Sequence, residues 1–249
     1  NGRKQTENIF THMQFDDNFY EFNLGYGDVN LVVNKEILGH EELGAFVTFL
    51  SASELRVKTY IRQKKIVDSI RNYFNGLKVY HFHETGEKSP FNTDCRIDDS
   101  FTLQSHGANL AAFLYKLQLN DPVVYNRIVK VIQSVAPYFL DFDLRPNAEG
   151  SEYIRLAWHD KYSENRYGVT DFSDGTIRFI ALVTLFLQPN PPAVIIIDEP
   201  ELGLHPFALS KLAGLVQSIA GRGTQVILST QSVELVNCFN PEDIITVDN

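Results

Sequence analysis

Two adjacent carboxylates, Asp198 and Glu199, follow a run of four apolar residues at 194–197. Such a β-branched run is typical of a strand that is buried on both faces of a parallel sheet, and open parallel sheets bind ligands at the carboxyl ends of their strands. One carboxylate there could hold Mg²⁺ while the next polarises an attacking water, which is the chemistry of a nucleotide hydrolase. An acidic turn after a buried strand is the alternative that these two residues alone leave open.

The last eighty residues predict the sheet that must position these carboxylates. Strands are expected at 193–197, 224–229 and 244–247, and they alternate with helices at 174–187, 206–220 and 232–238. Pro206 opens the second of these helices and Gly221 closes it. This alternation is typical of a parallel α/β sheet with right-handed crossovers, so the two carboxylates should lie at its ligand-binding edge.

The first hundred residues have a different pattern. Apolar and polar residues alternate over 19–38 around a glycine-containing turn, which predicts an antiparallel hairpin. A basic helix is expected over 51–74, starting from a capping box at Ser51 or Ser53, and a strand is expected at 77–82. The helix is the candidate for a contact with DNA or RNA, and a solvated helix face is the alternative.

The central region is expected to be helical. Apolar residues at helical spacing predict a helix over 107–119, and Asp121 followed by Pro122 predicts the start of a second helix that packs on the first. Two antiparallel strands are expected at 138–145 and 152–159, on either side of a Pro- and Gly-containing turn.

Composition limits the class of protein. The chain has 249 residues, 44% of them hydrophobic, and a formal net charge of −9. It contains neither a run of about eighteen apolar residues nor a charged-then-apolar leader, so a cytoplasmic protein without a membrane span is expected. Cys95 and Cys238 lie far apart without metal-ligand spacing and are expected to be reduced thiols. The acidic balance argues against a chain that is one large nucleic-acid-binding surface.

Four blocks of sequence carry a resemblance to one family: HGANLA at 106–111, FSDGTIRF at 172–179, IDEPELGLHP at 197–206 and STQS at 229–232. In this order they resemble the carboxyl-terminal part of ABC-type ATPases of the RecF-like, SMC-like and OLD-family group, and most closely the small prokaryotic AAA family ATPases. The resemblance implies an α/β P-loop NTPase fold, with a parallel sheet core, an antiparallel β region and a helical lobe. We expect three regions: an antiparallel β and helix region at 1–104, a helical lobe with a β-hairpin at 105–165, and the ATPase core at 166–249.

The resemblance assigns the first part of a nucleotide site to residues 173–176. Ser173, Asp174, Gly175 and Thr176 stand where such ATPases carry the LSGGQ signature, at a helix start whose free N–H groups receive a γ-phosphate. Asp174 replaces the first Gly of that signature and Thr176 replaces Gln. The alternative is an ordinary helix start in which Ser173 is only the N-cap.

The resemblance assigns the second part to the strand ends. Asp198 resembles the Walker B aspartate that holds the metal, and Glu199 resembles the catalytic glutamate. His205 is similar to an interface or nucleotide-sensing residue, or else it is a polar residue at a helix start. Gln231 occupies the position of the switch histidine, where it can donate a hydrogen bond but cannot carry a charge.

A G-x-x-x-x-G-K-[ST] loop is absent from the 249 residues. This Walker A loop supplies the backbone cradle for a triphosphate, and the family places it upstream of the segment that corresponds to Asn1. The chain is therefore expected to be an ATPase that is incomplete by itself. A degenerate subunit that supplies only the signature to another chain is the alternative.

The resemblance implies an enzyme that hydrolyses ATP with Mg²⁺ across a head-to-tail homodimer. Hydrolysis would control a partner effector, such as a separately encoded nuclease in anti-phage defence, or nucleic-acid binding. A DNA-repair or chromosome-structure scaffold is a second hypothesis, although the sequence contains no long heptad arm. A transporter ATPase subunit is a third, and the DEPELGLHP form disfavours it.

Overall fold

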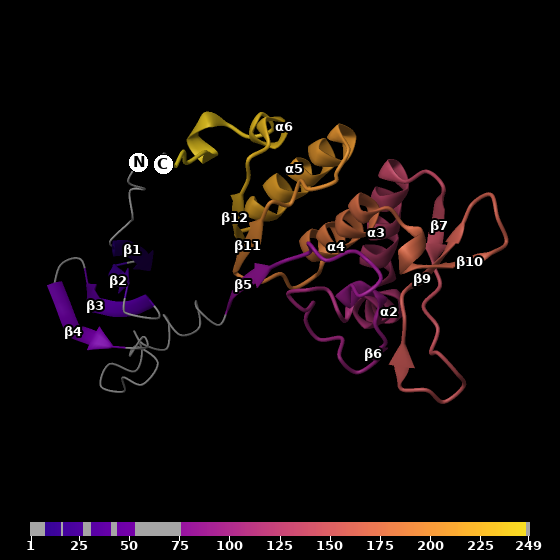
Figure 1. Ribbon diagram of the computed structural model, residues 1–249, viewed down its shortest axis with the longest axis horizontal. Coiled ribbons are helices and arrows are strands. Elements are labelled where there is room, and N and C mark those ends of the chain that lie inside the picture. Colours follow the sequence, from indigo (N-terminus) through magenta and orange to yellow (C-terminus); the bar gives the residue numbers. More distant parts are fainter. Residues whose placement is uncertain (1–7, 16, 27–30, 41–43, 53–75, 248–249) are drawn as a thin grey trace. The chain divides into compact units, whose positions relative to one another are not determined.

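A computed structural model describes residues 8–15, 17–26, 31–40, 44–52 and 76–247 (Figure 1). The chain divides into two compact units, residues 1–76 with 247–249 and residues 77–246, and each is described here by itself. The divisions expected at 104 and 165 stay a prediction. Within the described ranges no helix is both long and apolar enough to cross a membrane.

The first unit contains a four-stranded antiparallel sheet. Its strands are β1 (Asn8–Phe15), β2 (Asn18–Tyr26), β3 (Leu31–His40) and β4 (Gly44–Ala52), paired in this order. β2 and β3 confirm the predicted hairpin over 19–38. The helix expected from Ser51 is wrong at its start, because Ala52 pairs with Val33 of β3 and the ladder of β4 takes precedence over the capping box. The rest of that helix, and Ser53, lie outside the described residues.

The second unit contains the predicted parallel sheet. Its strands are β5 (Leu77–Tyr80), β11 (Val194–Asp198) and β12 (Gln225–Ser229), with β11 between the other two. Val194, Ile195 and Ile197 are buried, but Ile196 is only half-buried, and its neighbours Val79 of β5 and Ile227 of β12 are 37% and 45% exposed. The burial expected on both faces of this strand is therefore complete on one face only. Asp198 is aligned with Ser229 of β12, so the carboxylates leave the sheet beside the end of the next strand.

Five helices accompany this sheet. They are α2 (Leu110–Asn120), α3 (Pro122–Val135), α4 (Asp174–Leu187), α5 (Pro206–Ala220) and the short α6 (Val233–Val236). The predicted bounds of α4 and α5 are confirmed, and Asp121 caps α3 by accepting a hydrogen bond from the Val124 N–H (3.3 Å). α6 is shorter than predicted.

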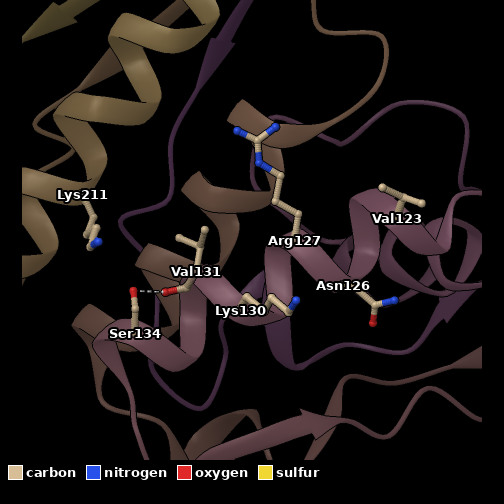
Figure 2. Close-up of a pocket in the computed structure, with 7 residues that line it drawn as sticks. All are labelled: Val123, Asn126, Arg127, Lys130, Val131, Ser134 and Lys211. Atoms are coloured by element: carbon tan, nitrogen blue, oxygen red, sulfur yellow. Dashed lines mark hydrogen bonds between the residues drawn. The ribbon is translucent and has the colours of Figure 1, made fainter.

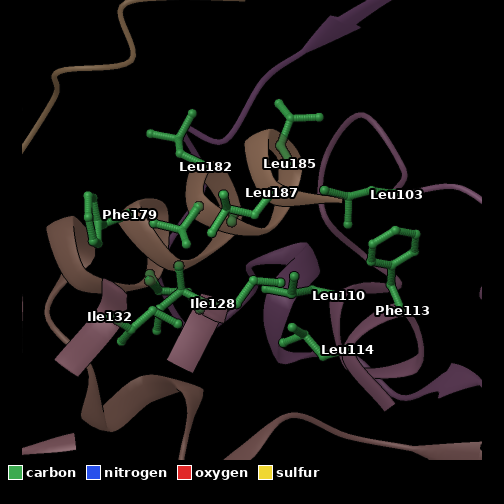
Figure 3. Packing of buried hydrophobic residues seen from close by; sticks show 14 of the residues in the cluster. Leu103, Leu110, Phe113, Leu114, Ile128, Ile132, Phe179, Leu182, Leu185 and Leu187 are labelled. Carbon is green, nitrogen blue, oxygen red and sulfur yellow. The ribbon is translucent and has the colours of Figure 1, made fainter. Parts of the chain in front are cut away.

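α4 is the centre of the core. Every residue of its 177–187 segment is buried, and a helix that is apolar all round must be covered on all sides. α3 and α5 both pack against it (Figure 1). Figure 3 shows Phe179, Leu182 and Leu185 of α4 in one cluster with side chains of α2 and α3. The core therefore holds the start of α4 in a defined place.

A small antiparallel region completes the second unit. β7 (Phe139–Phe142), β9 (Ala157–Asp160) and β10 (Arg166–Gly168) form one sheet, and β6 (Cys95–Arg96) pairs with β8 (Tyr153–Ile154). The single strand predicted at 152–159 is thus wrong, because its two ends serve different sheets. Ile154 pairs with Cys95, whereas Trp158 pairs with Phe142.

The strand expected at 244–247 is also wrong. These residues are irregular, and Ile245 and Val247 are 90% and 87% exposed. A strand needs a hydrogen-bonding neighbour, and within the described ranges β12 pairs only with β11. The β-branched composition alone was therefore insufficient to form a strand.

Asn109, which belongs to the HGANLA block, organises the loop before α2. It is fully buried, its Oδ1 accepts a hydrogen bond from the Gln104 N–H (2.9 Å), and its Nδ2 donates to the carbonyl oxygens of Asp99 (2.9 Å) and Thr102 (2.8 Å). The Asn109 side chain thus satisfies backbone groups of this loop that no helix or strand pairs. Its role is structural.

We expect Asn109→Ala to lower the free energy of unfolding by about 1–3 kcal/mol, because buried polar groups of the loop lose their partner. Urea unfolding followed by circular dichroism measures this change. Asn126→Ala, at an exposed position of α3, is the control and should stay within about 0.5 kcal/mol of the parent chain. Equal effects of the two substitutions would contradict the structural role of Asn109.

Candidate functional site

Asp198 stands at the carboxyl end of β11 with its side chain exposed. Its Oδ1 accepts a hydrogen bond from the Ser229 hydroxyl of β12. This contact follows from the strand register and orients the carboxylate along the edge of the sheet. A carboxylate has about four acceptor sites, so Asp198 retains oxygens that can bind a ligand.

Glu199 has an unusual backbone conformation. Its φ is 41°, in the left-handed region that residues other than glycine rarely occupy. The Glu199 N–H donates to the Ser229 carbonyl (2.9 Å), and Gln231 Nε2 donates to Glu199 Oε1 (3.4 Å). Such strain costs on the order of 1–3 kcal/mol, persists only where the surroundings impose it, and clusters at active sites.

Glu201 connects the two segments that follow β11 and β12. Its Oε1 accepts hydrogen bonds from the Thr230 hydroxyl and from the Gln231 N–H (3.3 Å). Its Oε2 is buried and has no hydrogen-bond partner among the described residues. Sequence reasoning gave Glu201 no role of its own. The signal that could have found it is a third acidic residue close behind the pair 198–199.

The start of α4 carries the signature-like residues. Ser173 is the N-cap, and its Oγ accepts a hydrogen bond from the Thr176 N–H (3.2 Å). The Thr176 hydroxyl lies 2.8 Å from Ser173 Oγ and 3.3 Å from the Tyr138 hydroxyl. Ser173 and Asp174 remain exposed, so the capped helix start is open to a ligand. Ser173 therefore does cap α4, which was the alternative to a phosphate contact in the sequence analysis.

Gly175 brings the helix start against the loop after β11. A Cβ at Gly175 would overlap the carbonyl oxygen of Gly203, and Gly203 itself has a left-handed φ of 73°. The two backbones touch because both residues are glycine. The structure thus brings the signature-like segment and the 199–205 loop together within one chain.

Arg178 of α4 is hydrogen-bonded to the loop after β11 and to the segment after β5. It is 7% exposed, and its guanidinium donates hydrogen bonds to the carbonyl oxygens of Phe82 (2.9 Å), His83 (3.1 Å) and Leu202. Burial lowers the pKa of Arg178, although a guanidinium stays charged in proteins. The sequence analysis quoted Arg178 without assigning it a task. The signal that could have identified Arg178 is that it is the one basic residue in the apolar helix 174–187, because a buried charge needs hydrogen-bond partners.

His205 lies further along the same loop, as the N-cap of α5. Its Nδ1 accepts a hydrogen bond from the Phe207 N–H (3.3 Å). The structure therefore joins Asp198, Glu199 and Gln231 at the strand ends, and it places His205 at the neighbouring helix start. In the described part of the chain no hydrogen bond connects Ser173 with Asp198 or Glu199.

No cluster of three or more His, Cys, Asp or Glu side chains that could hold a metal ion occurs among the described residues. A divalent ion at the strand ends would therefore take at most two such side chains from the described residues and would complete its coordination with other oxygen ligands. Mg²⁺ has this coordination habit, because it keeps water and phosphate ligands and takes only one or two carboxylates from the protein.

Comparisons with known proteins place the chain among ATPases. Residues 51–237, more than half of the chain, match the family described as "AAA domain, putative AbiEii toxin, Type IV TA system". Over 65 residues the chain is 37% identical to a protein of Streptomyces coelicolor described as an ABC transporter ATP-binding protein, covering 26% of this chain and 11% of that one. Over 57 residues it is 35% identical to the energy-coupling factor transporter ATP-binding protein EcfA of Methanocaldococcus jannaschii. This match covers 23% of this chain and 20% of that protein.

These matches thus span a fifth or less of either relative. Among solved structures, the SMC head bound to the C-winged helix domain of ScpA aligns with 89% of this chain and 68% of that chain, at 12% identity and a TM-score of 0.47.

Gly175→Ala should lower the thermal midpoint of the second unit, because the added methyl group meets rigid backbone at Gly203 rather than a flexible side chain. Differential scanning calorimetry measures the midpoint. The matched control is Gly214→Ala within α5, where nothing lies within 4 Å of the added methyl group. This control should be neutral or stabilise the chain by up to about 1 kcal/mol. A stable Gly175→Ala variant would contradict the close packing.

Proposed function

Because the chain belongs to this AAA domain family, we propose that it forms the Walker B, signature and switch portion of an ABC-type ATPase that hydrolyses Mg²⁺-ATP. The family membership confirms the resemblance carried by the four sequence blocks. It also confirms the expected α/β P-loop fold, whose parallel sheet and helices form the second unit. Hydrolysis, the homodimer and the partner belong to the proposal.

The edge of the sheet fits Mg²⁺ by the chemistry of its donors. Asp198 is exposed at the end of β11 with free acceptor capacity, and the buried Glu201 Oε2 lacks a hydrogen-bond partner among the described residues. A buried carboxylate oxygen without a partner is unusual and favours a nearby cation or water. Asp198 would hold the ion, and the bound ion would neutralise charge on the phosphates.

Glu199 is the proposed base, and its strained backbone is the observation that carries the proposal. The left-handed residue directly follows β11, and the two carboxylates have different partners, Ser229 for Asp198 and Gln231 for Glu199. Glu199 would accept a proton from the attacking water. Gln231 donates to Glu199 Oε1, so it would orient the carboxylate without moving a proton itself.

The signature-like helix start is proposed to act on a nucleotide that another copy of the chain holds. Ser173 and Asp174 are exposed, which leaves them accessible to a nucleotide held by another subunit. Ser173 and the N–H group of Gly175 would donate to the γ-phosphate. Thr176, whose own N–H donates to Ser173 Oγ, would hold that hydroxyl in place, and Asp174 and His205 would lie at the shared face. ATP would thereby hold a homodimer together.

Dimerisation is proposed to control a separate effector protein, for which a nuclease of an anti-phage system is our candidate. The family description names a toxin of a toxin–antitoxin system, which supports a chain that acts beside a partner. Control of DNA or RNA binding is the other use that the same ATP-driven dimer allows.

Glu199→Gln should leave ATP binding intact and slow hydrolysis by at least about 100-fold, because the amide cannot accept the proton while Asp198 still holds the metal. The test uses the whole gene product, since hydrolysis needs a Walker A loop and the 249 residues contain none. Phosphate release under saturating ATP gives the rate, and the 249-residue chain alone is the inactive control. Unchanged turnover would remove Glu199 from the role of base.

Ser173→Asp separates the proposed phosphate contact from helix capping. Aspartate caps helices as well as serine does, so a purely structural role predicts no change. A γ-phosphate next to residue 173 instead predicts that the added negative charge abolishes ATP-driven dimerisation while ATP affinity per subunit changes less than about twofold. Analytical ultracentrifugation of the whole gene product with ATP measures the dimer. Equal dimerisation of variant and parent would assign Ser173 to capping alone.

A further inference from the structure

A groove lies between α3 and α5, away from the strand-end carboxylates. It encloses about 550 Å³, and Figure 2 shows its lining, which is Val123, Asn126, Arg127, Lys130, Val131 and Ser134 of α3 with Lys211 of α5. Residues 123, 127, 130 and 134 are exposed and recur at helical spacing, so they form one outward stripe of α3. The proposed ATP hydrolysis does not use this groove.

The positive charge of the groove is uncompensated. Arg127, Lys130 and Lys211 form no ion pair within the described ranges. α2, α3 and α5 contain no Asp or Glu, although the chain has 31 acidic residues and a net charge of −9. Asp121, the nearest acidic residue in sequence, already caps the start of α3. Such segregation in an acidic chain indicates an anionic partner.

A second arginine-lined hollow shows the contrast. It encloses about 540 Å³ and includes Arg145, Arg155 and Arg166. There Asp94 pairs with Arg155 (2.8 Å), and Asp143 pairs with Arg145 (2.5 Å) and Arg166 (2.7 Å). Arg145 and Arg166 also hold the pKa of Asp143 below its ordinary value. In that hollow each arginine is paired with an aspartate, whereas the groove between α3 and α5 has no acidic residue in its lining.

Exposed apolar side chains accompany the cations of the groove. Val123 on its wall is 79% exposed, and Phe207 at the start of α5 is 50% exposed. The Lys211 ammonium lies 5.3 Å from the centre of the Phe207 ring. Val123 in the lining and Phe207 beside Lys211 thus add exposed apolar surface to the cations of the groove, which matches an amphipathic ligand.

We propose that this groove docks an acidic amphipathic helix of a separate partner protein. Apolar side chains of that helix would contact Val123, Val131 and Phe207, and its carboxylates would pair with Arg127, Lys130 and Lys211. A nucleic-acid backbone would use the cations but not the exposed apolar side chains, so the observations favour a protein segment. The inference goes beyond the proposed hydrolysis, because docking requires neither ATP nor a dimer.

The test measures binding of a designed probe to the full 249-residue chain by fluorescence anisotropy. The probe is a labelled helical peptide of about 18 residues, or five turns, with leucine on one face and glutamate and alanine on the other. Arg127→Glu combined with Lys130→Glu should weaken its binding at least tenfold. Lys211→Glu, on the other wall, should weaken it independently. Val123→Ser should weaken it about threefold without altering the charge.

The matched control is Lys88→Glu combined with Lys161→Glu, which makes the same charge change at exposed positions outside the groove. It should alter the affinity less than twofold. Circular dichroism checks that each variant is folded. A probe that binds parent and groove variants equally would overturn the proposal. It would also be overturned if a DNA or RNA duplex bound through Arg127 and Lys130 while the acidic peptide did not bind.

Discussion

The buried guanidinium of Arg178 is the interaction on which the site depends. It rises from the apolar core helix α4 and donates to carbonyl oxygens of two segments that are distant in sequence, 82–83 after β5 and Leu202 in the loop after β11. An unpaired charge at 7% exposure would be strongly destabilising, so these three carbonyl groups must stay in place around it. The position of the 199–205 loop is thereby coupled to the core.

This coupling explains how a strained residue can be retained beside the ligand edge. Glu199 has a left-handed backbone between two fixed points, the hydrogen bond of its N–H to Ser229 and the loop that Arg178 holds. Gly175 and Gly203 allow the start of α4 to approach the same loop without a side chain between them. The carboxylates of the strand ends and the exposed signature-like helix start thus share one rigid support, as the proposed ATP-dependent dimer requires.

The two faces of the second unit differ in their electrostatics. The strand-end edge carries the carboxylates of Asp198 and Glu199, which suit a metal ion that also binds phosphates. The groove between α3 and α5 presents Arg127, Lys130 and Lys211 and has no acidic residue in its lining. Both α3 and α5 pack against α4, whose N-cap is Ser173, so a partner docked in the groove would contact the helices that support the proposed nucleotide site.

The sequence by itself determined the features that local chemistry controls. Proline, cap residues and apolar periodicity sufficed for the bounds of α4 and α5, and the β-branched run before Asp198 sufficed for the central parallel strand. Only the tertiary structure decided which distant segments meet. It assigned Arg178 and Glu201 their partners, divided 152–159 between two sheets and left 244–247 without a strand. The physical reason is that caps and periodicity act within a few residues, whereas strand pairing and buried polar contacts depend on which surfaces the packed core brings together.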